Sequence, residues 1–493
     1  MTPDSDPLTR FAHVFPVNRG LYYGGQWHQA IDGGSIAVSS PSSGASLGSV
    51  AAGSAADLDL AVAAAHVAQA EWRKTAPMVR TKAVRAAADR IRAHRADLAM
   101  LDVLDCGNPV MGMEFDVDLG TTLMDFFAGL ATEVKGETIP AGGDKLNYVQ
   151  REPIGLVGRI IPFNHPMMFT LAKMAAPIIA GNAVILKPSE QTPLAALRIA
   201  ELIGDLFPAG LFSVLNGSGE LGAAMSGHPG IGNISVVGSA ATGRAVMRQG
   251  ADTLKRLTLE LGGKNALIVF PDADVEKTIA GAVKGMNLGW TGGQSCGSTS
   301  RVLVHDSLYD KVVAGLTAEF DKVKVGDPMD RQTEMGCMSM RGQYEKVLRL
   351  IEQAKDEGAR MASGGPVPGE LSDGLFVRPT LFADVTPDMT IASQEVFGPV
   401  LSVMRWSDYD TMMETVNSVE YGLTASVWTR DLETAFRAVN DIDAGYVWVN
   451  NSSDHTLGAP FGGFKQSGLG REECLEEILG YTEQKNVSVT LSG

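Results

Sequence analysis

The feature that most constrains the fold is a regular alternation of short strand-like runs and helical stretches that begins after Arg151. The runs LVGRIIP, NAVILKP, LFSVLNG, NISVVGS and NALIVF are rich in Val, Ile and Leu, and segments such as PLAALRIAELIGDLF separate them. Strands buried on both faces of a parallel sheet have such runs, and crossover helices join them. The pattern therefore predicts a parallel sheet covered by helices.

A second series of strand-like runs follows Cys296, namely RVLVH, LFVRPTLF, LSVMRW, TASVWT and GYVWVN. Helical stretches again separate the runs, so we expect a second α/β domain, and 493 residues are enough for two or three domains. Ahead of both series, the Ala-rich segment from Ala55 to Leu104 predicts two amphipathic helices. The Gly262-Gly263 pair is a break at which the chain can cross between domains.

Composition excludes several classes of protein. The net charge of −16 argues against nucleic acid and anionic membranes as partners. Pro177 and Gly181 interrupt the central apolar stretch, which is shorter than the ~20 residues of a membrane helix. The four cysteines are far apart, so we expect no metal site and no disulfide, and the first residues do not resemble a signal peptide. These features predict a cytoplasmic protein that acts on a small molecule.

Two residues are candidates for catalysis, one as a nucleophile and one as a general base. Cys296 lies in WTGGQSCGSTSR, whose small side chains leave a thiol accessible, and a nucleophilic cysteine needs a lowered pKa. Glu260 lies between apolar residues and a glycine pair, where poor solvation raises the pKa of a carboxyl toward that of a useful base. A salt bridge to Lys264 is the structural alternative for Glu260. We expect the remaining cysteines to be inert core residues: Cys106, Cys337 and Cys474.

Asn164 lies between two prolines that fix the local backbone, in the sequence Ile161-Pro162-Phe163-Asn164-His165-Pro166. A rigidly held amide can stabilise an oxyanion, although a role in a turn is the more usual one for asparagine.

Two glycine-rich segments follow strand-like runs. Residues 217–222, GSGELG, match GxGxxG, but no acid follows about 20 residues later to bind a ribose, so we interpret these glycines as turn and helix-start residues. Gly238 to Gly243 opens a helix, whose free N–H groups favour phosphate.

Taken together, the motifs resemble those of the aldehyde dehydrogenase superfamily, in the same order and over nearly the whole chain. The segment Pro162–Pro166 resembles the oxyanion motif of that family, and Glu260–Lys264 and Gly293–Cys296 resemble its base and nucleophile motifs. Other matching segments are the adenosine-ribose site, the phosphate turn, the nicotinamide-ribose site and a late loop: Leu186–Glu190, Gly238–Gly243, Glu395–Pro399 and Pro460–Lys465.

The resemblance implies roles for individual residues. Cys296 would be the nucleophile, Glu260 the general base and Asn164 the oxyanion donor, with Lys173 as a further catalytic residue. The implied contacts to an NAD cofactor are Ile161, Pro162, Phe163, Lys187, Ser189, Glu190, Gly238, Ser239, Gly243, Leu261, Glu395 and Phe397. An acid at Glu190 favours NAD because it repels the 2′-phosphate of NADP, although Lys187 and Ser189 leave NADP open.

The resemblance also implies a fold and an assembly. We expect a Rossmann-like cofactor domain (1–134 and 151–259), an α/β catalytic domain (260–465) and a small β oligomerisation arm (135–150 and 480–493). The arm consists of two segments that resemble edge strands in need of a partner on another subunit. The protein would then be a homodimer or homotetramer.

The implied reaction is NAD(P)-dependent oxidation of an aldehyde to a carboxylic acid through a thiohemiacetal and a thioester on Cys296. A CoA-acylating enzyme is the alternative, but such relatives generally lack the acid at Glu260. A cofactor-binding protein without catalysis is a second alternative, although it would be free to lose Cys296, Glu260 and Asn164.

The expected substrate pocket departs from the family pattern. His165 replaces the usual aromatic residue after Asn164, Phe163 replaces the usual Trp before it, and Ala172 is small where many relatives have a bulky aromatic. We therefore expect a pocket that admits a bulky or aromatic aldehyde, unless other side chains fill the space. Its predicted lining is His165, Phe169, Ala172, Ser295, Gly297, His455 and Phe461.

Overall fold

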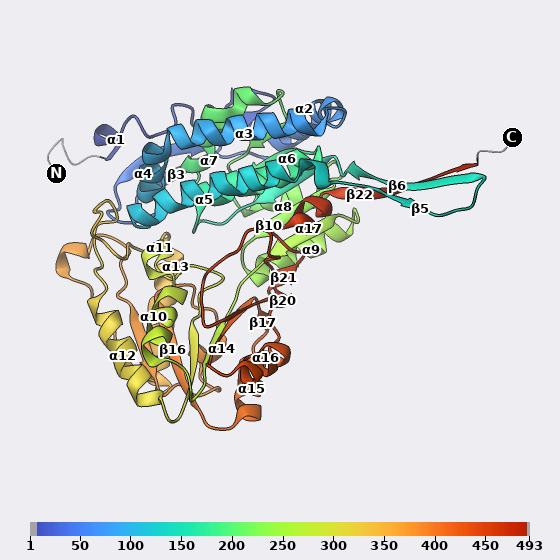
Figure 1. Ribbon diagram of the computed structural model, residues 1–493. Coiled ribbons are helices and arrows are strands. Elements are labelled where there is room, and N and C mark those ends of the chain that lie inside the picture. Colours follow the sequence, from blue (N-terminus) through green and yellow to red (C-terminus); the bar gives the residue numbers. More distant parts are fainter. Residues whose placement is uncertain (1–6, 491–493) are drawn as a thin grey trace.

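The computed structural model describes residues 7–490, which form two α/β lobes and a slender β arm that projects from one lobe (Figure 1). Residues 1–6, predicted to begin the cofactor domain, and residues 491–493, predicted to end the arm, lie outside the described residues. None of the described helices is long and apolar enough to cross a membrane.

The first lobe contains a mixed sheet in the order β2-β1-β9-β8-β7-β10-β11-β21. Its five central strands are parallel: β7 (Leu156–Ile160), β8 (Ala183–Lys187), β9 (Phe212–Val214), β10 (Asn233–Val237) and β11 (Arg256–Glu260). The first four of these strands correspond to the runs LVGRIIP, NAVILKP, LFSVLNG and NISVVGS, whereas none of the predicted runs includes β11. The antiparallel additions are short and have no strong sequence signal: β1 (Leu21–Tyr23), β2 (Gln26–His28) and β21 (Gly468–Leu469).

Helices cover this sheet and share one apolar core with it (Figure 1). They are α2 (Ala55–Trp72), α3 (Pro77–Ala93), α4 (Arg95–Cys106), α5 (Val110–Gly129), α6 (Pro166–Ala180), α7 (Leu194–Ile203), α8 (Gly219–Gly227) and α9 (Ala240–Ala251). The prediction of two helices before residue 104 is wrong, because His94 leaves the helical conformation (φ −111°, ψ 18°) and separates α3 from α4. Further short elements are α1 (Pro7–Arg10) and the hairpin of β3 (Ser35–Ser39) and β4 (Ser46–Ala51).

The second lobe contains a sheet in the order β14-β15-β16-β13-β12-β18-β19, parallel except for β14. Its strands are β12 (Ala266–Val269), β13 (Arg301–His305), β14 (Arg360–Ser363), β15 (Thr380–Ala383), β16 (Val400–Trp406), β18 (Thr424–Trp428) and β19 (Tyr446–Val449). The run NALIVF therefore forms a central strand of this sheet and does not continue the first one. The two α/β sheets and the overall architecture confirm the predicted fold class.

The helices of the second lobe pack on both faces of its sheet around two apolar clusters. They are α10 (Val275–Gly285), α11 (Leu288–Thr291), α12 (Tyr309–Lys322), α13 (Arg341–Asp356), α14 (Thr390–Ser393), α15 (Tyr409–Asn417) and α16 (Leu432–Asp441). The chain crosses between the lobes over residues 261–265, which include the predicted break at Gly262-Gly263. Before the chain returns to the first sheet at β21, β17 (Tyr421–Gly422) and β20 (Phe464–Lys465) form a small two-stranded sheet.

The arm is a three-stranded sheet of β5 (Glu137–Ile139), β6 (Lys145–Pro153) and β22 (Thr482–Thr490), which follows α17 (Leu475–Gly480). The two segments predicted to lack a partner in their own chain pair with each other, from Thr482 opposite Pro153 to Thr490 opposite Lys145. That prediction is corrected, since the C-terminal strand β22 is itself the partner of β6.

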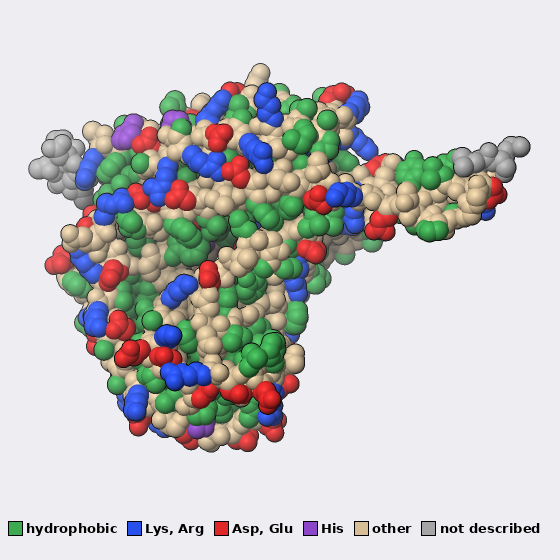
Figure 2. All heavy atoms as spheres, viewed as in Figure 1, with side chains coloured by type: hydrophobic (Ala, Val, Ile, Leu, Met, Phe, Trp, Pro, Cys, Tyr) green, Lys and Arg blue, Asp and Glu red, His purple; other side chains and the backbone are tan. Residues whose placement is uncertain are grey.

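On the face shown in Figure 2, acidic and basic side chains are interspersed over the body of the molecule.

Candidate active site

Cys296 lies in a tightly turned loop that follows α11. Gly292 and Gly293 adopt left-handed conformations (φ 60° and 76°), and a Cβ on Gly293 would lie 2.5 Å from the Gly398 carbonyl oxygen. The side-chain amide of Asn265 donates to the Cys296 carbonyl at 2.7 Å and fixes the loop. Cys296 is half-buried, whereas the other three cysteines are buried, as expected for core residues. The loop thus presents one accessible thiol.

The Gly262-Gly263 pair does more than mark a crossing between the lobes. A Cβ on Gly262 would lie 2.5 Å from the Glu395 carboxylate, and one on Gly263 would lie 2.5 Å from the Cys296 carbonyl oxygen. The backbone N–H of Gly263 donates to Glu395 Oε1 at 2.9 Å. Both positions therefore need glycine, because the crossing segment must approach the nucleophile loop and Glu395 this closely.

Glu260 ends β11 and is buried, and it lines the same two cavities as Cys296. Burial and the negative charge of Glu472 raise the pKa of Glu260 well above its ordinary value. Among the described residues, Glu260 and Lys264 form no ion pair, so the structural alternative considered for this acid is not observed. Glu260 has the environment of a general base.

The expectation of a lowered pKa for Cys296 is wrong. Burial, followed by the negative charges of Glu260 and Glu395, raises the pKa of the thiol well above its ordinary value. The thiol therefore keeps its proton at neutral pH unless a base removes it, and Glu260 is in position to do so.

Asn164 is buried beside the nucleophile loop. Its side-chain amide donates to the Gln294 carbonyl at 2.8 Å, and Asn108 donates to the Asn164 carbonyl at 2.9 Å. A side-chain amide has two N–H donors, so one remains for an oxygen at Cys296. This arrangement links Asn164 to the nucleophile loop and goes beyond the turn role considered from the sequence.

A buried network of charges adjoins Glu260. Lys173 Nζ, on α6, lies 2.5 Å from Glu472 Oε2, and Arg159 Nη2 on β7 lies 3.0 Å from Glu477 Oε1. Burial alone would lower the pKa of Lys173, but the charges of Glu472 and Glu477 raise it above its ordinary value. Sequence reasoning selected Lys173 and missed both acids, which follow the late loop and belong to no motif.

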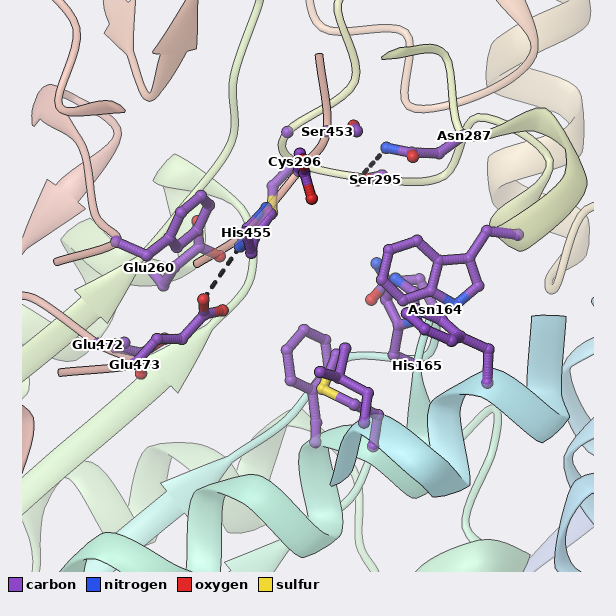
Figure 3. A pocket seen from close by; sticks show the side chains of 18 of the residues that line it. Asn164, His165, Glu260, Asn287, Ser295, Cys296, Ser453, His455, Glu472 and Glu473 are labelled. Carbon is purple, nitrogen blue, oxygen red and sulfur yellow. Dashed lines mark hydrogen bonds and ion pairs between the residues drawn. The ribbon is translucent and has the colours of Figure 1, made fainter. Parts of the chain in front are cut away.

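Two cavities meet at Cys296, and Asn164, Glu260 and Cys296 border both of them. The larger cavity encloses about 1000 Å³ of space outside protein atoms, and Figure 3 shows Cys296 and Glu260 among the side chains around it. The predicted pocket residues that line it are His165, Phe169, Ser295, Gly297, His455 and Phe461. Its apolar lining also includes side chains that no motif indicated: Phe115, Leu119, Met168, Trp290 and Leu457.

The prediction that Ala172 lines this cavity is wrong. Ala172 is buried in α6, whereas Phe169 and Lys173 line the cavity. In an α-helix, the side chain four positions later lies more nearly above a given residue than the side chain three positions later. Phe169 and Lys173 therefore share one face of α6, and Ala172 lies to one side of that face.

The smaller cavity, of about 560 Å³, lies on the other side of Cys296. Its lining includes predicted cofactor residues, namely Pro162, Phe163, Gly238, Ser239, Glu395 and Phe397. The rings of Phe163 and Phe397 meet edge to face with centroids 5.9 Å apart, and Gln343 donates to the Phe397 carbonyl at 2.9 Å. Burial raises the pKa of Glu395. Gln343 and Lys346 also line this cavity, and sequence reasoning missed both because they occur in an ordinary amphipathic helix.

The remaining predicted cofactor residues lie outside both cavities, at or beside the carboxyl ends of the parallel strands. Lys187 ends β8, where its carbonyl accepts from Ile161 N at 3.1 Å and its Nζ lies 3.6 Å from Glu190 Oε2, with Ser189 between them. A Cβ on Gly243 would lie 2.5 Å from the Leu261 side chain, so this glycine lets α9 pack against the segment after Glu260. Ligands of open α/β sheets bind at such strand ends.

The two glycine-rich segments have the local structures predicted for them. Ser218 caps α8 by accepting from Glu220 N at 3.2 Å, and a Cβ on Gly217 would lie 2.5 Å from Leu221, so residues 217–222 form a turn and a helix start. Ser239 caps α9 in the same way, by accepting from Thr242 N at 3.1 Å. Only α9 begins at the smaller cavity, which contains Gly238 and Ser239.

Lys264 is a buried residue whose role the sequence did not indicate. Among the described residues, no group forms a hydrogen bond with its ammonium nitrogen. Burial, together with repulsion from Arg301 and Lys346, lowers the pKa of Lys264 to about 7.

Comparison with known proteins identifies the family and the fold. The aldehyde dehydrogenase family profile matches residues 27–487. The chain is 43% identical to aldehyde dehydrogenase tropH of Talaromyces stipitatus over 502 residues, covering 100% of this chain and 97% of that protein. The chain belongs to the aldehyde dehydrogenase family. This membership confirms the predicted family and its enzyme class, NAD(P)-dependent aldehyde dehydrogenase.

Solved structures of aldehyde dehydrogenases have the same fold. Betaine aldehyde dehydrogenase from Staphylococcus aureus, in complex with NAD+, superimposes with a TM-score of 0.95 at 33% identity, covering 99% of this chain and 98% of that one. PnpE from Pseudomonas sp. WBC-3, in complex with nicotinamide adenine dinucleotide, superimposes with a TM-score of 0.94 at 38% identity, covering 97% and 98%. Relatives of this dehydrogenase therefore bind the cofactor that the motifs predict.

Proposed function

We propose that this dehydrogenase uses NAD to oxidise a bulky or aromatic aldehyde to the free carboxylic acid. The observation that carries the proposal is that Cys296 and Glu260 lie together at the point where the two cavities meet. One cavity then receives the aldehyde and the other the nicotinamide, with a nucleophile and a base between them.

The chain's own residues support the bond-forming steps. Glu260 takes the proton of the Cys296 thiol, and the thiolate adds to the aldehyde carbon to give a thiohemiacetal. The free N–H of the Asn164 amide donates to the developing oxyanion. Lys173 acts on Glu260, because its positive charge lowers the pKa of that carboxyl.

The residues around the smaller cavity fit an NAD cofactor. The amino end of α9 offers N–H groups for phosphate, and the buried Glu395 carboxylate can accept hydrogen bonds from ribose hydroxyls. When bound, NAD supplies the hydride acceptor that turns the adduct on Cys296 into a thioester. Glu190 favours NAD over NADP by repulsion of a 2′-phosphate.

Hydrolysis completes the proposed reaction. Glu260 releases the thiol proton to solvent before this step, so that its carboxylate can take a proton from water. A buried carboxyl with a raised pKa is suited to do so near neutral pH, and Glu260 lines the same cavities as the sulfur that carries the acyl group. Transfer to CoA is the alternative end of the reaction, and it would need no such base.

The lining of the larger cavity supports a bulky or aromatic substrate without any contribution from Ala172. Phe115, Met168, Phe169 and Trp290 offer apolar and aromatic surface, and Gly297 leaves open space beside the thiol.

The organisation of the molecule around this site extends the proposal. We propose that residues 1–134 and 151–259 bind the cofactor and that residues 260–465 provide the nucleophile. Among residues 7–490, no strand pairs with the outer edge of β22, which supports a homodimer or homotetramer joined there. The four free cysteines are consistent with a reducing, cytoplasmic setting.

The test is NADH production from a panel of acetaldehyde, hexanal and benzaldehyde, with and without CoA. We expect turnover without CoA, release of the free acid, and higher kcat/KM for benzaldehyde than for acetaldehyde. Turnover that depends on CoA would replace hydrolysis by acyl transfer, and acetaldehyde as the best substrate would contradict the bulky pocket.

A further inference from the structure

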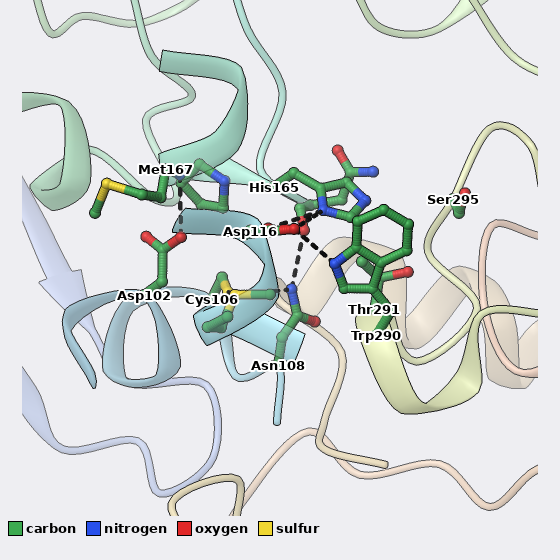
Figure 4. Close-up of polar contacts among 12 residues, drawn as sticks. Asp102, Cys106, Asn108, Asp116, His165, Met167, Trp290, Thr291 and Ser295 are labelled. Carbon is green, nitrogen blue, oxygen red and sulfur yellow. Dashed lines mark hydrogen bonds and ion pairs between the residues drawn. The ribbon is translucent and has the colours of Figure 1, made fainter. Parts of the chain in front are cut away.

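The imidazole of His165 is rigidly held in the wall of the larger cavity (Figure 4). Its Nδ1 lies 2.9 Å from Asp116 Oδ2, and the Trp290 indole donates to Asp116 Oδ1 at 2.6 Å. The ring also meets Trp290 and Phe169 edge to face, with centroids 4.6 and 5.5 Å apart. Both the position and the orientation of the imidazole are therefore fixed before a substrate enters.

The contact with Asp116 determines which nitrogen of His165 is free. A carboxylate only accepts hydrogen bonds, so Nδ1 carries a proton and Nε2 is the nitrogen that remains for another partner. With one proton on the ring, Nε2 is an acceptor. Within residues 7–490, no group forms a hydrogen bond with His165 Nε2. The side chain is 5% exposed, and the cavity is the space that its ring lines. An acceptor without a partner thus borders the substrate cavity.

The ring of His165 packs against the aromatic side chains of Phe169 and Trp290, and the Trp290 N–H donates to Asp116. Polar residues also line the cavity, but within the described part of the chain Asn287 and Ser295 bond to each other and not to the imidazole. A buried acceptor without a donor is unfavourable, and a phenylalanine at this position would avoid that cost. The His165–Asp116 pair is therefore better explained by a donor that the substrate brings.

We infer that His165, positioned by Asp116, accepts a hydrogen bond from a hydroxyl group on the substrate, so that this dehydrogenase prefers hydroxylated aromatic aldehydes. The inference rests on the proposed function and deepens it by naming the substrate class. The aromatic ring packs on the apolar lining, the aldehyde carbon faces Cys296, and the hydroxyl reaches His165 Nε2. Asp116 is a positioning residue, because it acts through the imidazole.

A second histidine in the cavity has a different chemistry. His455 Nδ1 lies 3.0 Å from Glu473 Oε2. Burial acts to lower the pKa of His455, but the hydrogen bond and charge of Glu473 outweigh it and raise that pKa above its ordinary value. His455 therefore tends to be protonated and to donate, whereas His165 accepts. A methoxy group can accept a hydrogen bond but cannot donate one, so it distinguishes the two histidines.

The experiment compares kcat/KM for benzaldehyde, its hydroxy isomers, the matching methoxybenzaldehydes and 4-carboxybenzaldehyde. We expect the best hydroxybenzaldehyde to exceed both benzaldehyde and its methoxy analogue by about tenfold or more, since the loss of one hydrogen bond to a buried group has at least this effect. The anionic 4-carboxybenzaldehyde should be a poorer substrate than the best hydroxybenzaldehyde, because an accepting nitrogen beside Asp116 offers a carboxylate no donor.

Variants of His165 and Asp116 test whether these two residues cause the preference for hydroxylated substrates. His165→Phe should bring the hydroxy-to-unsubstituted ratio close to one, and His165→Gln should retain part of it because its amide oxygen also accepts. Asp116→Asn should raise KM for the hydroxylated substrate with a smaller effect on benzaldehyde. Met168→Leu changes the same cavity without changing a hydrogen-bonding group, so it should leave the ratio unchanged.

The outcomes separate this inference from the proposed function. If no aldehyde in the panel is oxidised, the proposed function fails. If benzaldehyde is oxidised but the hydroxyl and methoxy substrates are equal in the wild-type enzyme, or if 4-carboxybenzaldehyde is preferred, the proposed function stands and the role of His165 is overturned. If His165→Phe does not fold, the role of His165 is tested by the hydroxy-to-methoxy ratio of the wild-type enzyme and by the ratio of His165→Gln.

Discussion

Lys173 Nζ lies 2.5 Å from Glu472 Oε2, and this buried ion pair sets the charge environment of Glu260. The negative charge of Glu472 raises the pKa of Glu260, and the positive charge of Lys173 lowers it. If catalysis needs Glu260 as a carboxylate, activity rises as pH passes upward through the pKa of Glu260. Replacement of Glu472 and replacement of Lys173 should therefore shift the acid limb of the pH–activity profile in opposite directions.

Glu472→Gln removes a negative charge and leaves Lys173 without its counter-ion, so both effects lower the pKa of Glu260. We expect the acid limb of the kcat profile to move to lower pH by about one unit. Lys173→Met should move it to higher pH for the converse reason. Profiles measured with a substrate of unchanged ionisation test this, and shifts in the same direction for both variants would contradict it.

Glu260→Gln should separate acylation from deacylation. Glutamine cannot take a proton from water, so we expect a burst of NADH on the first turnover and a steady rate lower by about 10² to 10⁴. Loss of the Glu260 charge should also lower the pKa of Cys296, because that charge raises it in the parent. The burst, followed by stopped-flow absorbance, should accelerate with rising pH as the thiol ionises.

Cys296→Ala is the control for this experiment, since it removes the sulfur and leaves the smaller cavity in place. That variant should show neither a burst nor steady turnover while still binding NAD. A Glu260→Gln enzyme without a burst at any pH would show that the carboxyl is indispensable before the thioester forms.

Replacement of Glu190 should relax the choice of cofactor. Glu190 lies 3.6 Å from the buried Lys187 ammonium, at the carboxyl end of β8. Glu190→Ala removes the repulsion of a 2′-phosphate and leaves Lys187 to attract it, so the NADP-to-NAD ratio of kcat/KM should rise about tenfold or more. Glu220→Ala, at the exposed start of α8, is the matched control and should leave the ratio unchanged. Equal ratios in both variants would place the discrimination elsewhere.

The sequence predicted those parts of the site that local patterns encode. The strand-like runs indicated the parallel strands that end near Asn164 and Lys187, because apolar periodicity follows directly from burial, but they did not include the strand that ends at Glu260. The resemblance placed Phe169 on the helix that lines the aldehyde pocket, and His455 was a candidate wall residue. Short antiparallel strands such as β1 and β21 could not be predicted, because they are not part of a longer apolar run.

The missed and mistaken features depend on distant contacts. Glu472 matters because folding brings it to Lys173, almost 300 positions earlier in the chain. The pKa of Cys296 is raised because Glu260 and Glu395 converge on it from two other segments. Asp116 gives His165 its fixed orientation from a different helix. No local spacing indicates such pairs, and the expected pocket residue Ala172 lies one position away from Lys173, a residue of α6 that lines the cavity.

The unpaired Lys264 leads to a final prediction, on stability. Its pKa is about 7 in the folded chain against an ordinary value of 10.5, so the unfolded chain binds more protons at this site throughout that interval. The contribution of Lys264 to the free energy of unfolding is therefore most unfavourable below pH 7 and improves as the pH rises toward 10.5. Lys264→Met removes the buried charge and should raise the thermal unfolding midpoint by a few degrees at pH 6. The gain should shrink steadily in melts at pH 8 and pH 9.5. Lys277→Met, at an exposed position on α10, is the control and should give a small difference that does not change with pH in the same way. A gain for Lys264→Met that stays constant from pH 6 to 9.5 would mean that Lys264 keeps its proton in the folded protein over this range, as it would if it had a partner there.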